Sequence, residues 1–274
     1  DRTGQDFDVV IVGGGLVGMS LALALDRVDG LRVLAIEAQA PSAPLAPRWD
    51  ERHFALGRAS TLALDALGVA YAAAGQHPIR RIHVSRRGAF GRTLLDAAAQ
   101  GLPAFGQIVP ARQLASALDD AMARTTRLER GRPARLQDFA AQDDHVALNL
   151  RVGDDMRPLR TRLLVAADGT DSAIRHTLAI PLQRHDYGQT AVVTAIEVER
   201  DLEGCAYERF TDSGPMALLP LDRRRAGLVM SLTTAQAATA LTLSDADFLA
   251  FAEQRFGTRL GHWRKVGQRQ PWPL

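Results

Sequence analysis

The most constraining feature of the sequence is a glycine-rich turn directly after the first apolar run. Residues 7–12, FDVVIV, are apolar and β-branched enough for a strand buried on both faces, and residues 16–25, LVGMSLALAL, continue as an apolar helix. Gly13, Gly15 and Gly18 lie between and within them in the pattern GxGxxG. In this pattern the first glycine permits a tight turn, the second lets backbone amides approach a pyrophosphate, and the third lets the helix pack closely on the strand.

The same apolar run, Val9–Leu25, is long enough to suggest a secretory signal or a membrane span. No basic segment precedes it, and the acidic residues Asp8 and Asp26 bracket it. Its glycines would also weaken a membrane helix that has no neighbour to pack on. We therefore interpret the run as a strand, a turn and a helix. Because no targeting segment is visible and the chain starts without methionine, we expect a trimmed, cytoplasmic chain.

A GxGxxG turn alone is weak evidence, because glycine-rich turns are common. The segment LRVLAIE predicts a second strand that ends in Glu37, nineteen residues after Gly18. An acid at about this offset binds ribose hydroxyls in dinucleotide-binding folds. The alternative for Glu37 is a solvated strand end. Strand, glycines, helix, strand and acid in this order favour dinucleotide binding.

Composition excludes several classes of protein. With 46% hydrophobic and 23% charged residues, the 274-residue chain has the composition of a globular protein of one or two domains. The formal charge is only +2, and the arginines show no basic run interleaved with aromatic residues, which argues against nucleic-acid binding. The single cysteine, Cys205, excludes an internal disulfide and a CxxC redox pair. No metal-binding spacing is found among His53, His77, His83, His145, His176, His185 and His262.

Hydrophobic periodicity predicts the remaining elements. Helical spacing predicts helices within residues 59–69, 109–124 and 244–257. Extended patterns predict strands within 79–88, 138–152, 159–168, 190–200, 205–212, 216–221 and 225–232. The proline-rich residues 38–50 are expected to form a loop. This order predicts an α/β nucleotide domain that is interrupted twice by pieces of an antiparallel sheet.

The strand predicted within residues 79–88 has a half-buried pattern. Ile82 and Val84 alternate there with Arg81, His83 and Ser85. One face of this strand is therefore expected to be apolar and the other polar.

A second informative segment is LLVAADGTDSAIR, residues 163–175. It places an Asp-Gly turn after an apolar strand, where ligands bind in open α/β folds. By itself, Asp-Gly also fits a plain strand-to-helix turn with Thr170 or Asp171 as the helix cap. The pattern ADGxxSxxR, more than a hundred residues after GxGxxG, resembles the second fingerprint of the flavin-dependent aromatic hydroxylases typified by para-hydroxybenzoate hydroxylase.

A third segment narrows the resemblance. AYERFTDSGPMALLPL, residues 206–221, is similar to the signature of the FAD-dependent hydroxylases of ubiquinone biosynthesis, most of all to the 2-polyprenyl-6-methoxyphenol hydroxylases. The segments DERHFAL, PARQLASAL and YGQTAVV add to the likeness. The resemblance thus runs through the whole chain.

The resemblance implies a fold and a chemistry. It implies an α/β fold in which a GxGxxG FAD-binding Rossmann-like domain carries an inserted antiparallel-sheet substrate domain. Residues 1–76 and 103–180 would form the FAD-binding domain, and residues 77–102 and 181–270 the substrate domain. FAD would be the cofactor and NADPH the co-substrate of a monooxygenase that uses O2 to hydroxylate a polyprenylated phenol in ubiquinone biosynthesis.

The resemblance also implies which residues bind the cofactor. The glycine turn and the helix start would hold the FAD pyrophosphate, and Glu37 the adenosine ribose. Arg52 and Arg112 match arginines that contact the flavin nucleotide, a role that suits the bidentate fork of arginine. The Asp168–Gly169 turn would serve both FAD and NADPH. The implied set is Gly13, Gly15, Leu16, Val17, Gly18, Glu37, Arg52, Arg112, Asp168 and Gly169.

No catalytic acid or base is assigned. In the segment YERF, strand alternation places Tyr207 and Arg209 on one face and Glu208 and Phe210 on the other. At most one of these pairs can line a cavity, and packing on neighbouring strands accounts equally well for either.

A further motif of the family, similar to GDAAH followed by PxxGQG, has no counterpart before the chain stops at QRQPWPL. The likeness therefore covers about the first two-thirds of a family member. We expect a truncated chain that keeps the adenine end of the flavin site and binds FAD weakly. We also expect it to form homo-oligomers through apolar surface that further helices would cover.

The implied partners follow from a hydrophobic polyprenyl-phenol substrate. They are the membrane, peripherally at its inner face, or a quinone-synthesis complex. Two other functions stay open: a non-catalytic nucleotide-binding or interaction module of a quinone-synthesis assembly, and an NAD-dependent dehydrogenase. A dehydrogenase would leave the Asp168–Gly169 turn and the YERF segment without a role. The sequence does not reveal the ring position hydroxylated, the prenyl length or the oligomeric state.

Overall fold

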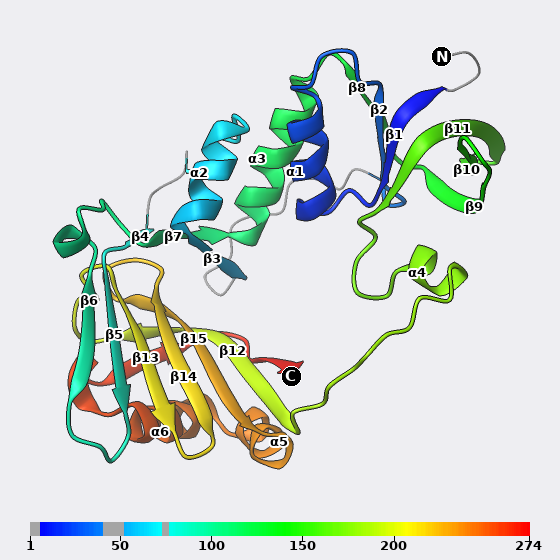
Figure 1. Ribbon diagram of the computed structural model, residues 1–274. Helices are drawn as coiled ribbons and strands as arrows, with labels where there is room; N and C mark the ends of the chain where they lie inside the picture. Colours follow the sequence, from blue (N-terminus) through cyan, green and yellow to red (C-terminus); the bar gives the residue numbers. More distant parts are fainter. Residues whose placement is uncertain (1–5, 41–51, 73–76) are drawn as a thin grey trace. The chain divides into compact units, whose positions relative to one another are not determined.

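The structure of the chain, a computed structural model, describes residues 6–40, 52–72 and 77–274. Its chain passes several times between two compact units (Figure 1). Unit 1 comprises Asp1–Leu45, Ala63–Tyr71 and Gln113–Gln183, and unit 2 comprises Ala46–Leu62, Ala72–Arg112 and Arg184–Leu274. Residues 46–62 and 103–112 thus belong to unit 2, although the sequence-based division groups them with the cofactor domain. The division into a cofactor and a substrate domain stays a prediction.

Unit 1 is built on a six-stranded sheet. The strand order is β8 (Leu128–Gly131), β2 (Val33–Ile36), β1 (Phe7–Val12), β11 (Asp155–Ala166), β10 (Val146–Val152) and β9 (Arg135–Ala141). The first four are parallel, and β10 and β9 extend the sheet in antiparallel pairing. Val10 and Ile11 are fully buried, as a strand covered on both faces requires. The carboxyl ends of β1, β2 and β11 therefore meet at one edge of the sheet.

The first four helices of the chain start and end close to where the sequence predicts. They are α1 (Leu16–Leu25), α2 (Arg58–Ala66), α3 (Ala111–Ala123) and α4 (Ala173–Thr177). α3 buries the predicted stripe of Leu114, Leu118 and Met122. The cap of α4 is Ser172, whose Oγ accepts a hydrogen bond from the amide of Arg175 (3.0 Å), rather than Thr170 or Asp171.

Unit 2 contains an eight-stranded and a three-stranded sheet. The larger has the order β16 (Trp263–Val266), β12 (Gln189–Val198), β15 (Arg225–Thr233), β14 (Gly214–Pro220), β13 (Cys205–Thr211), β5 (Arg81–Arg86) and β6 (Arg92–Asp96), with β17 (Gln270–Pro273) also on β12. The smaller consists of β3 (His53–Gly57), β7 (Gly106–Pro110) and β4 (His77–Ile79). The predicted antiparallel sheet is correct except that β13 and β5 pair in parallel. These strands come from distant segments, so no hairpin joins them. Since only a hairpin connection would require antiparallel pairing, the two strands can pair in parallel.

The two faces of the larger sheet differ. Helices α5 (Thr234–Thr242) and α6 (Asp245–Phe256) contribute to a buried cluster with one face, as shown by Phe248 and Phe256 packing with Met216, Leu218 and Leu228. Their starts are capped by Thr233 and by Ser244. On each strand, the residues that alternate with the clustered ones, such as Met216, Leu218 and Leu228, point to the opposite face.

The burial of β5 differs from the sequence-based expectation. His83 is only 5% exposed, whereas Ile82 and Val84 are half-buried. His83 lies on the helix-covered face, where its ring is 5.5 Å from that of Tyr207. Alternation alone separates the two faces of a strand but does not show which face a helix will cover.

Most of the predicted loop at residues 38–50 lies outside the described residues. Among the helices that the structure does describe, none combines the length and the apolar character needed to cross a membrane.

Candidate functional site

Two of the three motif glycines are required by the packing of unit 1 itself. Gly13 has φ +115°, and a Cβ there would overlap the carbonyl of Ala167, at the end of the neighbouring strand. A Cβ on Gly18 would overlap the carbonyl oxygen of Gly13. The turn after β1 therefore lies directly against the segment after β11, and α1 lies directly against the turn.

Gly15 is different, because no atom lies within 4 Å of a Cβ built on it, and its φ of −75° is ordinary. The space beside it is open. Gly15 is also the N-cap of α1, and it provides no side-chain cap for the helix amides. The first turn of α1 contains no acidic residue. An open helix N-terminus of this kind attracts an anion through its amides and its dipole.

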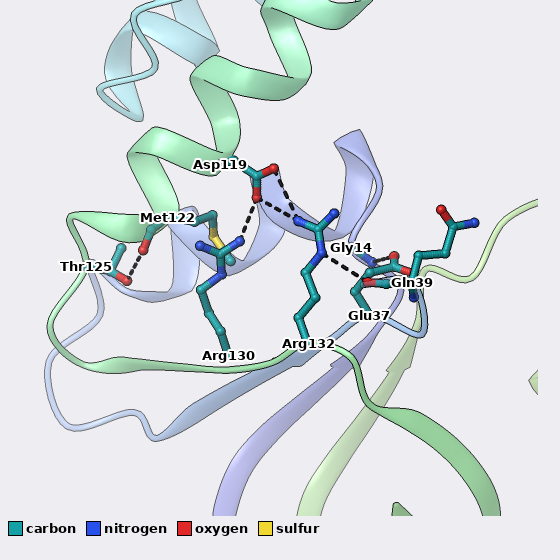
Figure 2. A network of polar contacts seen from close by, with 8 residues as sticks. All are labelled: Gly14, Glu37, Gln39, Asp119, Met122, Thr125, Arg130 and Arg132. Atoms are coloured by element: carbon teal, nitrogen blue, oxygen red, sulfur yellow. Dashed lines mark hydrogen bonds and ion pairs between the residues drawn. The ribbon is translucent and has the colours of Figure 1, made fainter. Parts of the chain in front are cut away.

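Glu37 follows β2 and is held by backbone amides. Its Oε2 accepts a hydrogen bond from the amide of Gly14 (2.8 Å), and its Oε1 accepts one from the amide of Gln39 (2.8 Å) (Figure 2). Each carboxylate oxygen has two acceptor positions. Glu37 is therefore fixed in orientation and keeps capacity to accept hydrogen bonds from ligand hydroxyls.

A second layer of contacts holds the Glu37 segment in place. Arg132 donates from Nε to the carbonyl of Gln39 (3.1 Å) and from one terminal nitrogen to both carboxylate oxygens of Asp119 in α3 (3.1 and 3.2 Å). Arg130 binds the same carboxylate at 2.6 Å. Figure 2 shows this chain of contacts running from α3 to the turn beside Gly14. The position of Glu37 is thus tied to a helix that the motif does not include.

Asp168 follows β11 and has one satisfied and one unsatisfied oxygen. Its Oδ2 accepts hydrogen bonds from the amides of Ala173 (2.8 Å) and Ile174 (3.4 Å). Its Oδ1 is buried, and no partner for it exists among the residues that the structure describes. Burial by itself would raise the pKa of this carboxyl, but hydrogen bonds from Ser172 and from backbone amides outweigh it, so the pKa is lowered. A buried charged acceptor without a partner points to a ligand donor.

These residues line one cleft of about 750 Å³ in unit 1. It brings together the predicted Gly13, Gly15, Glu37, Asp168 and Gly169. Further parts of the lining are Ala134–Phe139, mostly from β9, and residues of α4. The sequence predicted β9 only as a strand, because no local motif signals that an antiparallel extension borders the cleft.

Unit 2 has a pocket of its own, of about 250 Å³, on the face of the large sheet opposite α5 and α6. Its floor is apolar and includes Val193, Val229 and Leu219, and Gly227 leaves room among them. Arg52 lies at this pocket, with its guanidinium 4.9 Å from the ring of Phe54 and 5.1 Å from that of Trp272. The pocket has the character of a site for an aromatic or aliphatic ligand.

The YERF segment forms part of β13. Tyr207 packs on the helix-covered side, and burial is the main cause that raises its pKa to about 12. Glu208 points to the opposite face and pairs across the strands with Val84 and Ala217. Burial raises the pKa of Glu208, and no charged neighbour contributes to this shift.

Comparison with known proteins decides between the ligands that such a cleft can take. The family model described as an FAD binding domain matches residues 6–274. The chain belongs to this FAD-binding family. FAD is therefore the cofactor, as the sequence predicted.

Relatives in the FAD-binding family confirm the resemblance to ubiquinone-biosynthesis hydroxylases. The chain is 36% identical over 268 residues to ubiquinone hydroxylase UbiL of Rhodospirillum rubrum, which covers 97% of this chain and 61% of the relative. It is 31% identical over 263 residues to 3-demethoxyubiquinol 3-hydroxylase of Escherichia coli, covering 95% and 66%. The chain thus spans less than two-thirds of the length of these relatives.

Solved structures of the same fold include p-nitrophenol 4-monooxygenase PnpA of Pseudomonas putida, with a TM-score of 0.70, 19% identity, and coverage of 97% of this chain and 67% of that one. The probable FAD-dependent monooxygenase pqsL of Pseudomonas aeruginosa gives a TM-score of 0.74 at 21% identity, covering 98% and 73%. At these identities the likeness shows the fold alone. It confirms the predicted α/β fold of the para-hydroxybenzoate hydroxylase type.

The cleft of unit 1 fits the adenosine diphosphate half of FAD. The open space at Gly15 and the uncapped start of α1 suit a pyrophosphate, and the fixed carboxylate of Glu37 suits a ribose. Oδ1 of Asp168 has no partner among the described residues, so it has the capacity to accept a hydrogen bond from a hydroxyl group. The contacts of individual residues with FAD stay predictions, including those of Leu16 and Val17 in the first turn of α1.

The two predicted flavin-binding arginines belong to unit 2. Arg52 is exposed and lies at the pocket described above, and Arg112 is the second residue of α3. Neither lines the cleft of unit 1. Their role in binding the flavin nucleotide also stays a prediction.

Proposed function

We propose that the protein is an FAD-dependent, NAD(P)H-using aromatic hydroxylase that acts on a polyprenylated phenol in ubiquinone biosynthesis. The observation that carries the proposal is the cleft of an FAD-binding family member in which a buried carboxylate oxygen of Asp168 has no partner among the described residues. The ubiquinone hydroxylases among its relatives supply the reaction class. When bound, FAD takes up reducing equivalents from NADPH and activates O2, which is chemistry of the cofactor rather than of the chain.

In this proposal the residues of unit 1 bind and orient the cofactor. The amides at the start of α1 neutralise the pyrophosphate, and Glu37 accepts from the ribose hydroxyls. Asp168 is kept ionised by its hydrogen bonds, and its free oxygen accepts from a cofactor hydroxyl. The amides of Ala173 and Ile174 fix the orientation of this carboxylate through its other oxygen.

The residues of unit 2 would receive the aromatic substrate. The apolar pocket around Gly227 has the size of a small aromatic ring system with its substituents, and its floor is apolar. Glu208 lies on the same sheet face, separated from Val229 by Ala217 alone in the row across the strands. Its raised pKa suits a carboxyl that holds a proton close to a phenol.

The proposal includes two partners. A polyprenylated phenol partitions into the bilayer, so the protein would work at the inner face of the membrane, alone or within a quinone-synthesis assembly. The proposal also includes self-association of the chain. The apolar pocket does not indicate through which surfaces the copies would meet.

The test is a turnover assay with defined components. Protein with added FAD and NADPH is mixed with a polyprenylated phenol in detergent, and NADPH oxidation and the product mass are followed. We expect faster oxidation with the phenol, and one labelled oxygen atom per product when isotopically labelled O2 is supplied. The methyl ether of the same phenol is the control. FAD binding without phenol-stimulated oxidation would instead support a non-catalytic module.

A further inference from the structure

The β5–β6 hairpin of unit 2 ends in a turn that presents an aromatic side chain entirely to solvent. Phe90 is 108% exposed relative to an extended reference. Gly88 and Gly91 beside it have φ of +74° and +95°, which bend the backbone so that Phe90 stands at the tip. A phenylalanine in this position contributes nothing to the core of the unit.

Arginines surround this tip. Arg86 and Arg87 precede the turn and Arg92 follows it, and all three are exposed. Arg209 of β13 pairs with Ser85 of β5 and donates a hydrogen bond to its hydroxyl (3.2 Å). Burial and then the positive charges of Arg259 and Arg87 lower the pKa of Arg209, and burial and then the charge of Arg87 lower the pKa of Arg255. Within the described part of the chain, no ion pair joins any of these five arginines to a carboxylate. One acidic residue, Asp212, lies in the turn between β13 and β14.

Exposed apolar side chains also occur on both faces of the sheet behind the tip. Leu94 and Leu95 of β6 and Phe210 of β13 are 48%, 43% and 48% exposed. Phe210 is paired across the strands with Arg86. Aliphatic groups beside an aromatic tip suit hydrocarbon, whereas a nucleic-acid strand would need further aromatic platforms for its bases.

We propose that the hairpin tip, residues 86–92, together with Arg209 and Arg255, docks on an anionic lipid surface with Phe90 inserted among the headgroups. This extends the peripheral membrane association of the proposed function by naming the surface that makes it. Its test needs no cofactor, substrate or turnover, so a failure of either proposal can be distinguished from a failure of the other.

The chain supplies a matched control in unit 1. The β10–β11 hairpin also carries exposed apolar residues, Val152 (42%) and Met156 (48%), between Arg151 and Arg157. Its turn, however, contains acidic residues at positions 154 and 155. A hairpin tip with exposed apolar residues but balanced charge should have no preference for an anionic surface.

The first experiment is co-sedimentation of the purified chain with vesicles. We expect binding to phosphatidylcholine vesicles that contain phosphatidylglycerol, weakening as salt rises, and little binding to phosphatidylcholine alone. The double variant Arg86→Gln/Arg87→Gln should bind about thirtyfold more weakly, since each arginine near such a surface contributes about a factor of five. Phe90→Ser should bind about tenfold more weakly. The control variants Arg151→Gln/Arg157→Gln and Met156→Ser should bind as the parent does.

The second experiment reports insertion directly. A Phe90→Cys variant can be labelled selectively with an environment-sensitive dye, because the native Cys205 is only 4% exposed. We expect a blue shift with phosphatidylglycerol vesicles, and none for the dye on a Met156→Cys variant. Circular dichroism confirms that each variant is folded.

Several results would overturn the proposal. They are equal binding to neutral and anionic vesicles, equal losses in the tip and control variants, and no spectral shift at position 90 when the protein is vesicle-bound. Binding of single-stranded RNA that depends on Phe90, with no binding of vesicles, would assign the tip to a nucleic acid instead.

Discussion

The cleft of unit 1 and the sheet face of unit 2 each hold a half-buried carboxylate, and their surroundings shift its pKa in opposite directions. Around Asp168, hydrogen bonds from Ser172 and two amides outweigh the effect of burial and lower the pKa. Around Glu208, burial acts alone and raises it. The difference teaches that unit 1 is prepared for a polar ligand and a fixed negative charge, whereas unit 2 favours an apolar ligand and raises the pKa of its carboxyl.

The two regions also differ in why their glycines are there. Gly13 and Gly18 are required by close backbone packing, and Gly15 borders open space. In unit 2, a Cβ on Gly227 would make ordinary contacts at 3.6 Å or more with Leu221 and Leu219. Substitutions at these positions therefore separate loss of fold from loss of ligand.

The largest effect is expected for Gly13→Ala. The new Cβ would overlap the Ala167 carbonyl at a φ that side chains rarely adopt, so we expect about 3 kcal/mol or more of lost unfolding free energy. Urea denaturation measures it. Gly88→Ala, also at positive φ but with nothing within 4 Å, should cost only about 1 kcal/mol. Equal costs would mean that the turn does not pack on the segment after β11.

Gly15→Ala should leave the fold intact and weaken the cofactor. With open space around the new methyl, unfolding free energy should change by about 0.5 kcal/mol or less. FAD affinity should fall roughly tenfold to a hundredfold, because the methyl occupies the approach of the pyrophosphate. Fluorescence titration of FAD compares the variant with the parent. Unchanged affinity would place the pyrophosphate elsewhere.

How much of this the sequence predicts depends on whether the signal is local. Gly13, Gly15, Glu37 and Asp168 each end or follow a strand within a short motif, and the structure places them in one cleft. The β9 wall reaches the cleft only through sheet topology, which no short segment encodes.

Unit 2 was less predictable for the same reason. Its pocket takes residues from strands as distant as β3 and β17, so no window of the sequence contains it. The burial of His83 and the parallel pairing of β13 with β5 likewise depend on which segments meet. The strands β5, β12, β13, β14 and β15 were predicted, because alternation is a local pattern, whereas β3, β4, β6, β7, β16 and β17 were not.

The next prediction tests the opposite pKa shifts through stability against pH. A lowered folded pKa gives Asp168 a stabilising contribution that is present above its unfolded pKa of about 3.9 and lost as pH falls through the folded value. Asp168→Asn should therefore lose less stability than the parent below about pH 4. Thermal denaturation from pH 3 to 7 records it. If the parent and the variant lost stability equally at low pH, this would contradict the hydrogen-bonded, ionised state of Asp168.

Glu208→Gln should show the reverse sign. A raised folded pKa makes the contribution of Glu208 fully present below its unfolded pKa of about 4.3 and progressively lost as pH rises through the folded value. The glutamine side chain has no charge to bury, so the variant should gain stability relative to the parent at neutral pH. The same denaturation series measures this, and a variant less stable than the parent at pH 7 would show that Glu208 has a partner.

The smallest effect is expected in the unit 2 pocket. Gly227→Ala adds one methyl to its floor without a clash, so binding of a simple alkylphenol should weaken about threefold while FAD affinity stays constant. Equilibrium dialysis of the phenol, with FAD titration beside it, separates the two. Equal losses for both ligands would mean that the two regions are not independent.

The parallel pairing of β13 with β5 also has a consequence for how the protein is made. Arg209 bonds Ser85 across 124 residues of chain, so the β5–β6 hairpin emerges from the ribosome long before its neighbour exists. At roughly 5–20 residues per second, the wait is on the order of ten seconds. During that time the hairpin has an unpaired edge and no helix over His83. Newly made chains should therefore depend on a chaperone that shields extended apolar segments, more than the finished protein does.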